Sequence, residues 1–146
     1  MKPLFDHEKL KAYEVAIAFN GWVGKLLREV TEKAAVKDQL DRAATSIPLN
    51  IAEGNGKFSM KDRARYFDIA RGSALESASC LDVLVSRELV AVERVQEGKG
   101  MLFETVNMLM GLLRRLGYDF GSENWSSVVR EDSPGFGEQE QEQDKE

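Results

Sequence analysis

The chain has 146 residues, of which 42% are apolar and 31% charged, enough for one domain with a hydrophobic core. No apolar run approaches the roughly 20 residues that a membrane-spanning helix needs, so we expect no membrane partner. A single cysteine, Cys80, excludes an internal disulfide. That cysteine usage, and an N-terminus that turns charged too early for a signal peptide, predict a cytoplasmic protein.

The net charge of −5 is unevenly distributed along the chain. Residues 121–146 hold eight acids and two bases, which leaves 17 acids and 18 bases in residues 1–120. A nearly neutral body argues against a broadly basic surface for nucleic acid. The composition predicts a folded domain over residues 1–120 and an acidic, flexible and disordered tail over residues 121–146.

The first of four segments with helical periodicity runs from about residue 7 to residue 31. Asp6 stands before it as a plausible N-cap. Asn20 and Gly24 are weak points in its apolar stripe. The stripe itself consists of Leu10, Tyr13, Ile17, Leu27 and Val30.

The second segment runs from about residue 36 to residue 55, where Gly54 and Gly56 supply a stop. Its apolar face consists of Leu40, Ala43, Ala44, Ile47 and Ile51. Pro48 lies inside this segment and lacks the N–H that would bond the Ala44 carbonyl. We therefore predict a kinked second helix, with Thr45, Ser46 and Asn50 helping to satisfy the freed backbone groups.

The third and fourth segments complete the body of the chain. The third runs from about residue 59 to residue 88, and Ser59 with Asp62 resembles a capping box at its start. The fourth runs from about residue 92 to residue 116, and Gly117 ends it. Linkers of about three to five residues force consecutive helices to be antiparallel. The sequence therefore predicts an all-α, antiparallel, up-and-down four-helix bundle.

Residues that could support catalysis are scarce. His7 is the only histidine, so neither a His-based triad with Ser46 or Cys80 nor an ordinary zinc site can be assembled. Glu-x-x-His pairs for a di-metal bundle are also missing from the sequence. The stretch 54–57 lacks the spacing of a phosphate loop and follows a helix. We expect no enzyme, no cofactor and no metal.

Polar side chains recur on one face of the second segment and amid small residues in the third. Charges between closely packed helices need partners, because an unpaired buried charge is costly. We predict an Arg/Glu network that sets helix register within or between subunits, with a pocket for an anion as the alternative. Its members are Arg42, Ser46, Asn50, Glu53, Arg71, Ser73 and Glu76.

A basic cluster lies at the turn between the second and third segments. With Phe58 and Tyr66 nearby, these cations could contact phosphates while the rings stack on bases. Solvated surface is the competing interpretation, and the acidic tail is expected to compete for the same cations. The cluster consists of Lys57, Lys61, Arg63 and Arg65.

Two motifs in the middle of the chain resemble a known family. The first is Gln39-Leu40, Arg42-Ala43, Ser46-Ile47-Pro48 and Asn50-Ile51-Ala52-Glu53-Gly54; the second is Phe67, Ile69-Ala70-Arg71-Gly72-Ser73 and Glu76. Over about residues 5–118 the chain resembles the four-helix-bundle proteins encoded within intervening sequences of 23S ribosomal RNA genes, which have also been labelled ribosomal proteins. The acidic tail lies outside this resemblance.

The resemblance implies a ring, typically a homopentamer, and kinship with the accessory variability protein of diversity-generating retroelements. That accessory protein is strongly basic and binds a reverse transcriptase and nucleic acid, whereas the body of this chain is nearly neutral. Our leading interpretation is a non-enzymatic oligomeric scaffold that binds itself and a protein partner, such as a nucleic-acid-processing enzyme. The alternative is an accessory protein that binds RNA or DNA directly.

Overall fold

The computed structural model describes residues 2–118, which form four α-helices and two short 3-10 helices without a strand. In chain order these are η1 (Asp6–Lys9), α1 (Lys11–Glu29), α2 (Ala35–Gly56), α3 (Met60–Ser86), η2 (Val92–Val95) and α4 (Gln96–Arg115). The expected all-α four-helix fold is confirmed. The predicted acidic tail lies outside the described residues.

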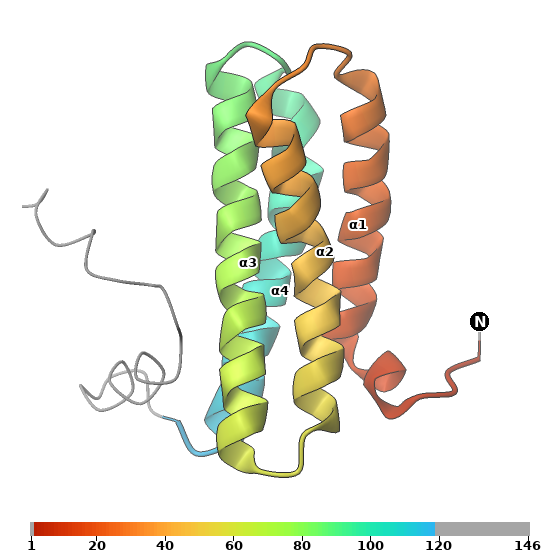
Figure 1. Ribbon diagram of the computed structural model, residues 1–146, viewed down its shortest axis with the longest axis vertical. Helices are drawn as coiled ribbons and strands as arrows, with labels where there is room; N and C mark the ends of the chain where they lie inside the picture. The colour runs from red at the N-terminus through yellow and green to blue at the C-terminus, as the bar shows by residue number, and fades with distance from the viewer. Residues whose placement is uncertain (1, 119–146) are drawn as a thin grey trace, which may run out of the picture.

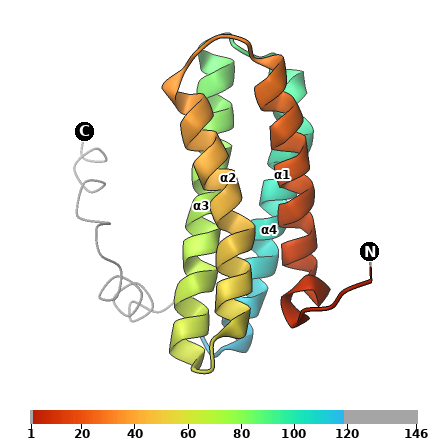
Figure 2. The same cartoon turned by 45° about the vertical axis from the view of Figure 1, so that its right-hand side comes forward.

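The helices run alternately up and down the bundle (Figure 1). Each packs against the next in sequence, and α1 packs against α4, so α1 is diagonal to α3 and α2 to α4 (Figure 2). The turn at residues 57–59 and the end of α4 lie at one end of the bundle, which we call the α2–α3 end. None of these helices is long and apolar enough to cross a membrane.

The core fills the space between the four helices. Its largest fully buried side chains are Phe19, Leu26, Leu40, Ile47, Ile51, Phe67, Leu81, Leu84, Leu102, Leu109 and Leu113. On α1 the buried face differs from the predicted stripe, because Ile17 is 47% exposed and Phe19 is fully buried. The alanines Ala12 and Ala16 share the buried face, where their small side chains let α1 lie close to its neighbours.

The start of α1 differs from the prediction. Leu10 has an extended backbone between η1 and α1, so the α-helix begins at Lys11 and has no side-chain cap. Asp6 therefore does not cap α1. Its carboxylate accepts a hydrogen bond of 2.9 Å from the side-chain amide of Asn55, which ties the N-terminal segment to the last turn of α2.

Two predicted helix ends are confirmed. Ser59 Oγ accepts a hydrogen bond of 3.1 Å from the backbone N–H of Asp62 and so caps α3. After α4, Gly117 adopts a φ of 91°, a conformation that costs glycine little. The N–H groups of Gly117 and Tyr118 then bond to the carbonyls of Arg114 and Leu113, the pattern of a Schellman motif.

Pro48 lies inside α2, and the helix continues beyond it to Gly56. The Ala44 carbonyl, which loses its helical donor to the proline, accepts a hydrogen bond of 2.8 Å from Asn20 Nδ2 on α1. The same amide donates to the Ala16 carbonyl at 2.8 Å. Asn20 is thus a support for α2 and no weak point, while the bend predicted at Pro48 stays a prediction.

On the other side of α1, a large ring meets a glycine. A Cβ added at Gly98 of α4 would lie 2.3 Å from the Trp22 ring, so only glycine fits there. Trp22 also stacks on Phe19, with ring centroids 5.8 Å apart. Above it, the Arg94 guanidinium donates to both carboxylate oxygens of Glu29 at 2.8 and 3.0 Å. These contacts seat α4 against α1.

Candidate functional site

Hydroxyl and amide groups connect α2 to α3. The hydroxyls of Ser46 and Ser73 share a hydrogen bond of 2.8 Å between the two helices. Asn50 Nδ2 donates to the carbonyl and hydroxyl oxygens of Ser46 at 2.8 and 2.9 Å. The buried Ser77 hydroxyl donates to the Ser73 carbonyl at 2.8 Å. Three of the predicted network residues therefore meet, and their directional bonds fix how α2 and α3 are aligned.

The charged members of the predicted network have other partners. Arg71 Nη2 lies 3.0 Å from Asp68 Oδ1, one turn earlier on the same helix. Glu53 Oε2 lies 3.8 Å from the Nζ of Lys57, the residue that directly follows α2. Sequence reasoning missed Asp68, although its i,i+3 spacing from Arg71 was a usable signal. Arg71 keeps 29% of its side chain exposed, so it needs no buried counter-charge.

Glu76 and Arg42 also lie on the α2–α3 surface. Glu76 Oε1 accepts a hydrogen bond of 2.9 Å from Gln39 Nε2, which links α3 to α2 near the exposed rim. The side chain of Arg42 is exposed, and we find no ion pair for it within residues 2–118. Pairing of these charged residues between subunits stays a prediction.

One member of the basic cluster has a structural role. The Arg63 guanidinium donates to the carbonyl of Asn55 at 2.9 Å and to that of Lys57 at 3.4 Å. The last carbonyls of a helix lack donors within it. Arg63 therefore caps the C-terminal end of α2, and this leaves Lys57, Lys61 and Arg65 as the cations that face outward.

Two of these cations lie over one aromatic ring. Lys57 Nζ is 5.1 Å and Arg65 Cζ is 5.2 Å from the centroid of the Tyr66 ring. Attraction between a cation and the ring face is worth about 0.5–1 kcal/mol at an exposed site. The contacts hold positive charge beside the turn between α2 and α3.

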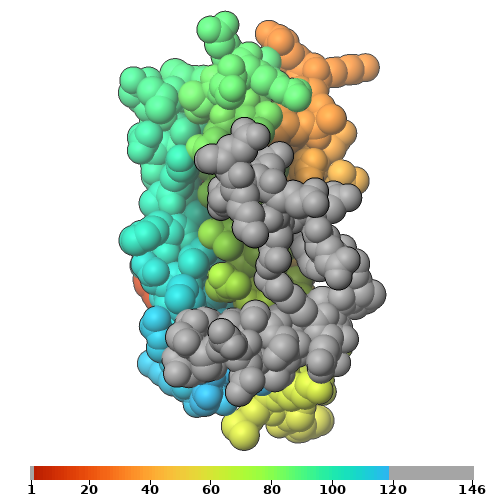
Figure 3. Space-filling view, turned by 90° about the vertical axis from the view of Figure 1, so that its left-hand side faces the viewer, coloured from red at the N-terminus to blue at the C-terminus, as the bar shows by residue number. Residues whose placement is uncertain are grey.

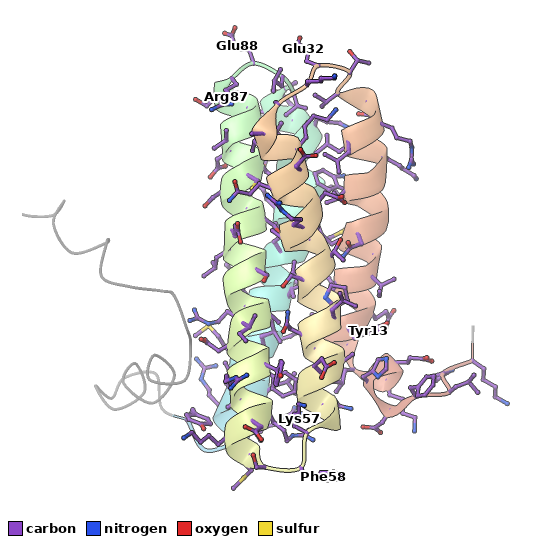
Figure 4. The ribbon with its side chains drawn as sticks, in the orientation of Figure 1. Tyr13, Glu32, Lys57, Phe58, Arg87 and Glu88 are labelled. Atoms are coloured by element: carbon purple, nitrogen blue, oxygen red, sulfur yellow. The ribbon has the colours of Figure 1, made fainter. Side chains whose placement is uncertain are left out.

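The same turn exposes large apolar side chains. Phe58 is fully exposed and Met60 is 64% exposed. Figure 4 shows Phe58 at the tip of the turn beside Lys57. The residues labelled at the opposite end, Glu32, Arg87 and Glu88, are all charged (Figure 4). We define the α2–α3 end surface as Lys57, Phe58, Met60, Lys61 and Arg65.

Further exposed apolar side chains lie in the middle of the helices. Ile17 on α1 and Leu49 on α2 are 47% and 60% exposed. Leu75 on α3 and Phe103 on α4 are 48% and 71% exposed. We call the outer surface that α1 and α2 present the α1–α2 side, and the outer surface that α3 and α4 present the α3–α4 side; Figure 3 looks onto the latter.

An exposed ion pair shows which residues of α3 and α4 lie opposite each other on the α3–α4 side. Lys99 Nζ lies 2.7 Å from Asp82 Oδ1. Phe103 follows Lys99 by four residues and Leu75 precedes Asp82 by seven, spacings that keep a helical residue on the same face. Since the two helices are antiparallel, both residues lie on the same side of the ion pair. Sequence reasoning missed this patch, because its prediction of the buried face rested on periodicity alone.

Titratable groups give no sign of catalysis in the described residues. The Cys80 thiol is buried, and desolvation followed by the nearby Glu76 charge raises its pKa, which disfavours the reactive thiolate. His7 lies edge-on to the Tyr13 ring at a centroid distance of 4.8 Å. Within residues 2–118, no three His, Cys, Asp or Glu side chains gather as a metal site would need.

Comparison with known proteins found similarity both in fold and in family. Among solved structures, the fold is similar to a protein of unknown function from the S23 ribosomal protein family of Bacteroides thetaiotaomicron, with a TM-score of 0.67. The two chains are 21% identical, and the match covers 70% of this chain and 98% of the other. No curated protein matched.

The family comparison covers most of the bundle. The family model of the 23S rRNA-intervening sequence protein matches residues 8–111, from η1 to the last turns of α4. Both motifs named in the sequence analysis fall inside that range. The chain therefore belongs to the 23S rRNA-intervening sequence protein family.

Proposed function

We propose that the protein is a non-enzymatic scaffold whose bundles assemble head to tail into a homopentameric ring that binds a partner protein. The observation that carries this proposal is the pair of exposed apolar patches on opposite sides of the bundle. Leu49 and Phe103, the most exposed members, lie on α2 and α4, which are diagonal to each other. Burying such side chains against another subunit would remove apolar area from water, which favours association.

Two separate apolar surfaces on one subunit are compatible with head-to-tail assembly, and closure into a pentamer is what the family resemblance implies. In a two-fold dimer the same patch meets itself, whereas a ring joins two different patches of successive subunits. A ring also gives every subunit two interfaces. Fully burying one Leu or Phe side chain contributes about 1.5–3 kcal/mol, while association costs about 4–15 kcal/mol. Using both sides of each subunit helps to offset that cost.

The non-enzymatic part of the proposal rests on the residues the structure describes. Cys80 is buried, and its raised pKa disfavours the thiolate that a nucleophilic cysteine requires. His7 lies in η1, outside the bundle core. The polar groups between α2 and α3 bond to one another, as expected of a structural contact.

Light scattering on the purified full chain tests the assembly. We expect a molar mass five times the 16.4 kDa of one chain. Replacing Phe103 with Glu should lower that mass, because it puts a charge into the proposed interface. A matched control is Val92→Glu, which changes an exposed apolar residue in η2, outside both sides. A native mass of one chain at tens of micromolar protein would reject the ring.

Direct binding of nucleic acid is the second candidate function. Lys57 and Arg65 flank the Tyr66 ring, and Phe58 beside them is free to stack on a base. Because Arg63 caps α2, the other three cations of the cluster can neutralise at most three phosphates. On duplex DNA, each neutralised phosphate contributes about −0.9 to the slope of log binding constant against log salt concentration. In gel-shift titrations, Lys61→Glu should abolish retention. Unchanged retention would exclude the cluster as the binding surface.

A further inference from the structure

The α2–α3 end surface exposes two large apolar side chains. Phe58 is fully exposed at the turn, with Met60 beside it. Leaving a Phe side chain in water instead of burying it forgoes a contact that typically stabilises a protein. Isolated apolar residues on a surface need no explanation, but these two are only two residues apart at the same turn, and Lys57, Lys61 and Arg65 flank them in the sequence.

The end of α4 lies at the same end of the bundle. Arg114 and Arg115 occupy the last turn of α4, and α3, which packs against α4, begins there with Met60 (Figures 1 and 2). Together with Lys57, Lys61 and Arg65, these arginines bring five basic side chains to one end of the molecule, where Glu53 and Asp62 are the neighbouring acids. An occupant of this surface should therefore be acidic and carry apolar side chains.

The chain itself supplies such a segment. Residues 121–146 have eight acids against two bases, and their apolar residues include Trp125, Val128 and Val129. The segment leaves the described structure at Tyr118, just after α4. Trp125 is seven residues further on, so the chain can carry it about 25 Å from that point. A helix with its side chains is about 10–12 Å wide, so the turn between α2 and α3 is within reach.

We propose that the α2–α3 end surface is the docking site of the chain's own acidic segment, residues 121–146. Trp125 packs on Phe58 and Met60, and the acidic side chains pair with the surrounding cations. The docked segment occupies the same surface that a phosphate-bearing partner would use, so the two compete. The docking does not depend on ring assembly, because the segment reaches the surface of its own subunit.

Tryptophan fluorescence can isolate the proposed contact. The chain has two tryptophans, and Trp22 is buried in the core. Subtracting the emission of a Trp125→Phe variant from that of the full chain leaves the signal of Trp125. Acrylamide quenching of this signal is compared with that of a free peptide of residues 119–146. At low salt, Trp125 in the full chain should be quenched severalfold less than in the peptide.

Two variants test whether the surface is the one named. Phe58→Ser removes the apolar contact, and the pair Lys61→Glu with Arg65→Glu reverses the charge. Both should raise the quenching of Trp125 to that of the peptide. The matched control is Lys33→Glu with Arg87→Glu at the opposite end of the bundle, which should leave quenching low. Circular dichroism checks that every variant keeps its helices, and light scattering records assembly separately.

Three results would overturn the proposal. The first is a Trp125 that is quenched in the full chain as strongly as in the free peptide at low salt. The second is low quenching that persists in both α2–α3 end variants, since the segment would then dock elsewhere. The third is protection that disappears when dilution dissociates the assembly, because the occupant would then be the segment of a neighbouring subunit. Whether the assembly is a pentamer does not bear on the first two results.

Discussion

The diagonally opposed helices α2 and α4 are held in the bundle by different means. α2 accepts a hydrogen bond from Asn20 of α1 at the Ala44 carbonyl, and its Ser46 shares one with Ser73 of α3. α4 is placed by shape, since Gly98 leaves room for the Trp22 ring. Around α4, the polar contacts to its neighbours are exposed ion pairs, such as that of Lys99 with Asp82.

This difference shows two ways of fixing helix register. Directional hydrogen bonds in a partly buried contact disfavour a shifted alignment, because a shift leaves polar groups unpaired. The Trp22 side chain, which fits over Gly98, also disfavours a shifted alignment, in this case by steric exclusion. The Trp22 Nε1–H illustrates the contrast, since it is buried without an acceptor among the described residues. Around α4, shape complementarity therefore outweighs the satisfaction of polar groups.

We expect the largest loss of stability at Gly98, where shape complementarity positions α4. Gly98→Val puts atoms where a Cβ alone would lie 2.3 Å from the Trp22 ring, so the ring or the helix must move. Overpacking a core typically costs about 1–3 kcal/mol, and we expect the upper end of that range. Denaturant unfolding measures the loss. Adding Trp22→Phe should recover part of it, because the smaller ring leaves space beside position 98.

Gly100 provides the matched control on the same helix. A Cβ added there meets nothing within 4 Å. Gly100→Ala should therefore raise stability by about 0.5–1 kcal/mol, through the better helix propensity of alanine. If both glycine substitutions change stability alike, steric fit at Gly98 is not what places α4.

We expect the second-largest loss of stability when the hydrogen bond from Asn20 to the Ala44 carbonyl is removed. Asn20→Ala should cost about 1–3 kcal/mol, because the Ala44 carbonyl loses its donor while Pro48 supplies none. In a Pro48→Ala background the backbone N–H returns, and the cost of Asn20→Ala should fall. A double-mutant cycle by denaturant unfolding measures this coupling. Strictly additive losses would show that Asn20 does not act through the Ala44 carbonyl.

A smaller loss is expected between α2 and α3. Ser73→Ala removes one hydrogen bond but leaves the Ser46 hydroxyl paired with Asn50, so we expect a loss of about 1 kcal/mol. Ser79→Ala on the exposed face of α3 is the control and should cost nothing. Thermal unfolding measures the melting temperature of each variant. Equal melting temperatures would reject a stabilising role for the Ser46–Ser73 contact.

The smallest effect belongs to an exposed ion pair near α4. The hydrogen bond from Arg94 lowers the pKa of Glu29 below its ordinary value of 4.5; desolvation opposes this shift, and the charge of Arg94 adds to it. A carboxylate with a lowered pKa adds stability above its unfolded pKa, and this is lost as pH falls through the folded value. Glu29→Gln should thus be slightly less stable at neutral pH, and the gap should close below pH 4.5. A gap that persists in acid would reject the pairing.

Local signals in the sequence predicted the helices well. Ser59 before a periodic segment and Gly117 after another mark helix ends, because capping and a positive φ depend on the residues at hand. The predicted start of the first helix was wrong, because the extended backbone at Leu10 separates η1 from α1. Asp6 was read as a cap and instead bonds to Asn55, a partner that is 49 residues away.

Contacts between helices were harder to predict. The polar spacing placed Ser46 and Asn50 on one face of the second helix and Ser73 amid small residues of the third, but it did not pair the two serines. It did not reveal that Asn20 supports Ala44, since that pairing depends on the register of α1 against α2. The fit of Trp22 over Gly98 depends on three-dimensional shape in the same way. The proposed subunit faces were missed because exposed apolar residues are ordinary in any one sequence.

The central claim, a ring built from two different sides of the bundle, is tested most directly by complementation between two variants. Leu49→Glu damages the α1–α2 side, and Phe103→Glu damages the α3–α4 side. Each variant alone should sediment with the 16.4 kDa mass of one chain, since each lacks one half of the contact. An equimolar mixture should associate into pairs of twice that mass, because one intact side remains on each variant. Variants that keep the native mass, or a mixture that stays unassociated at every concentration, would contradict the account.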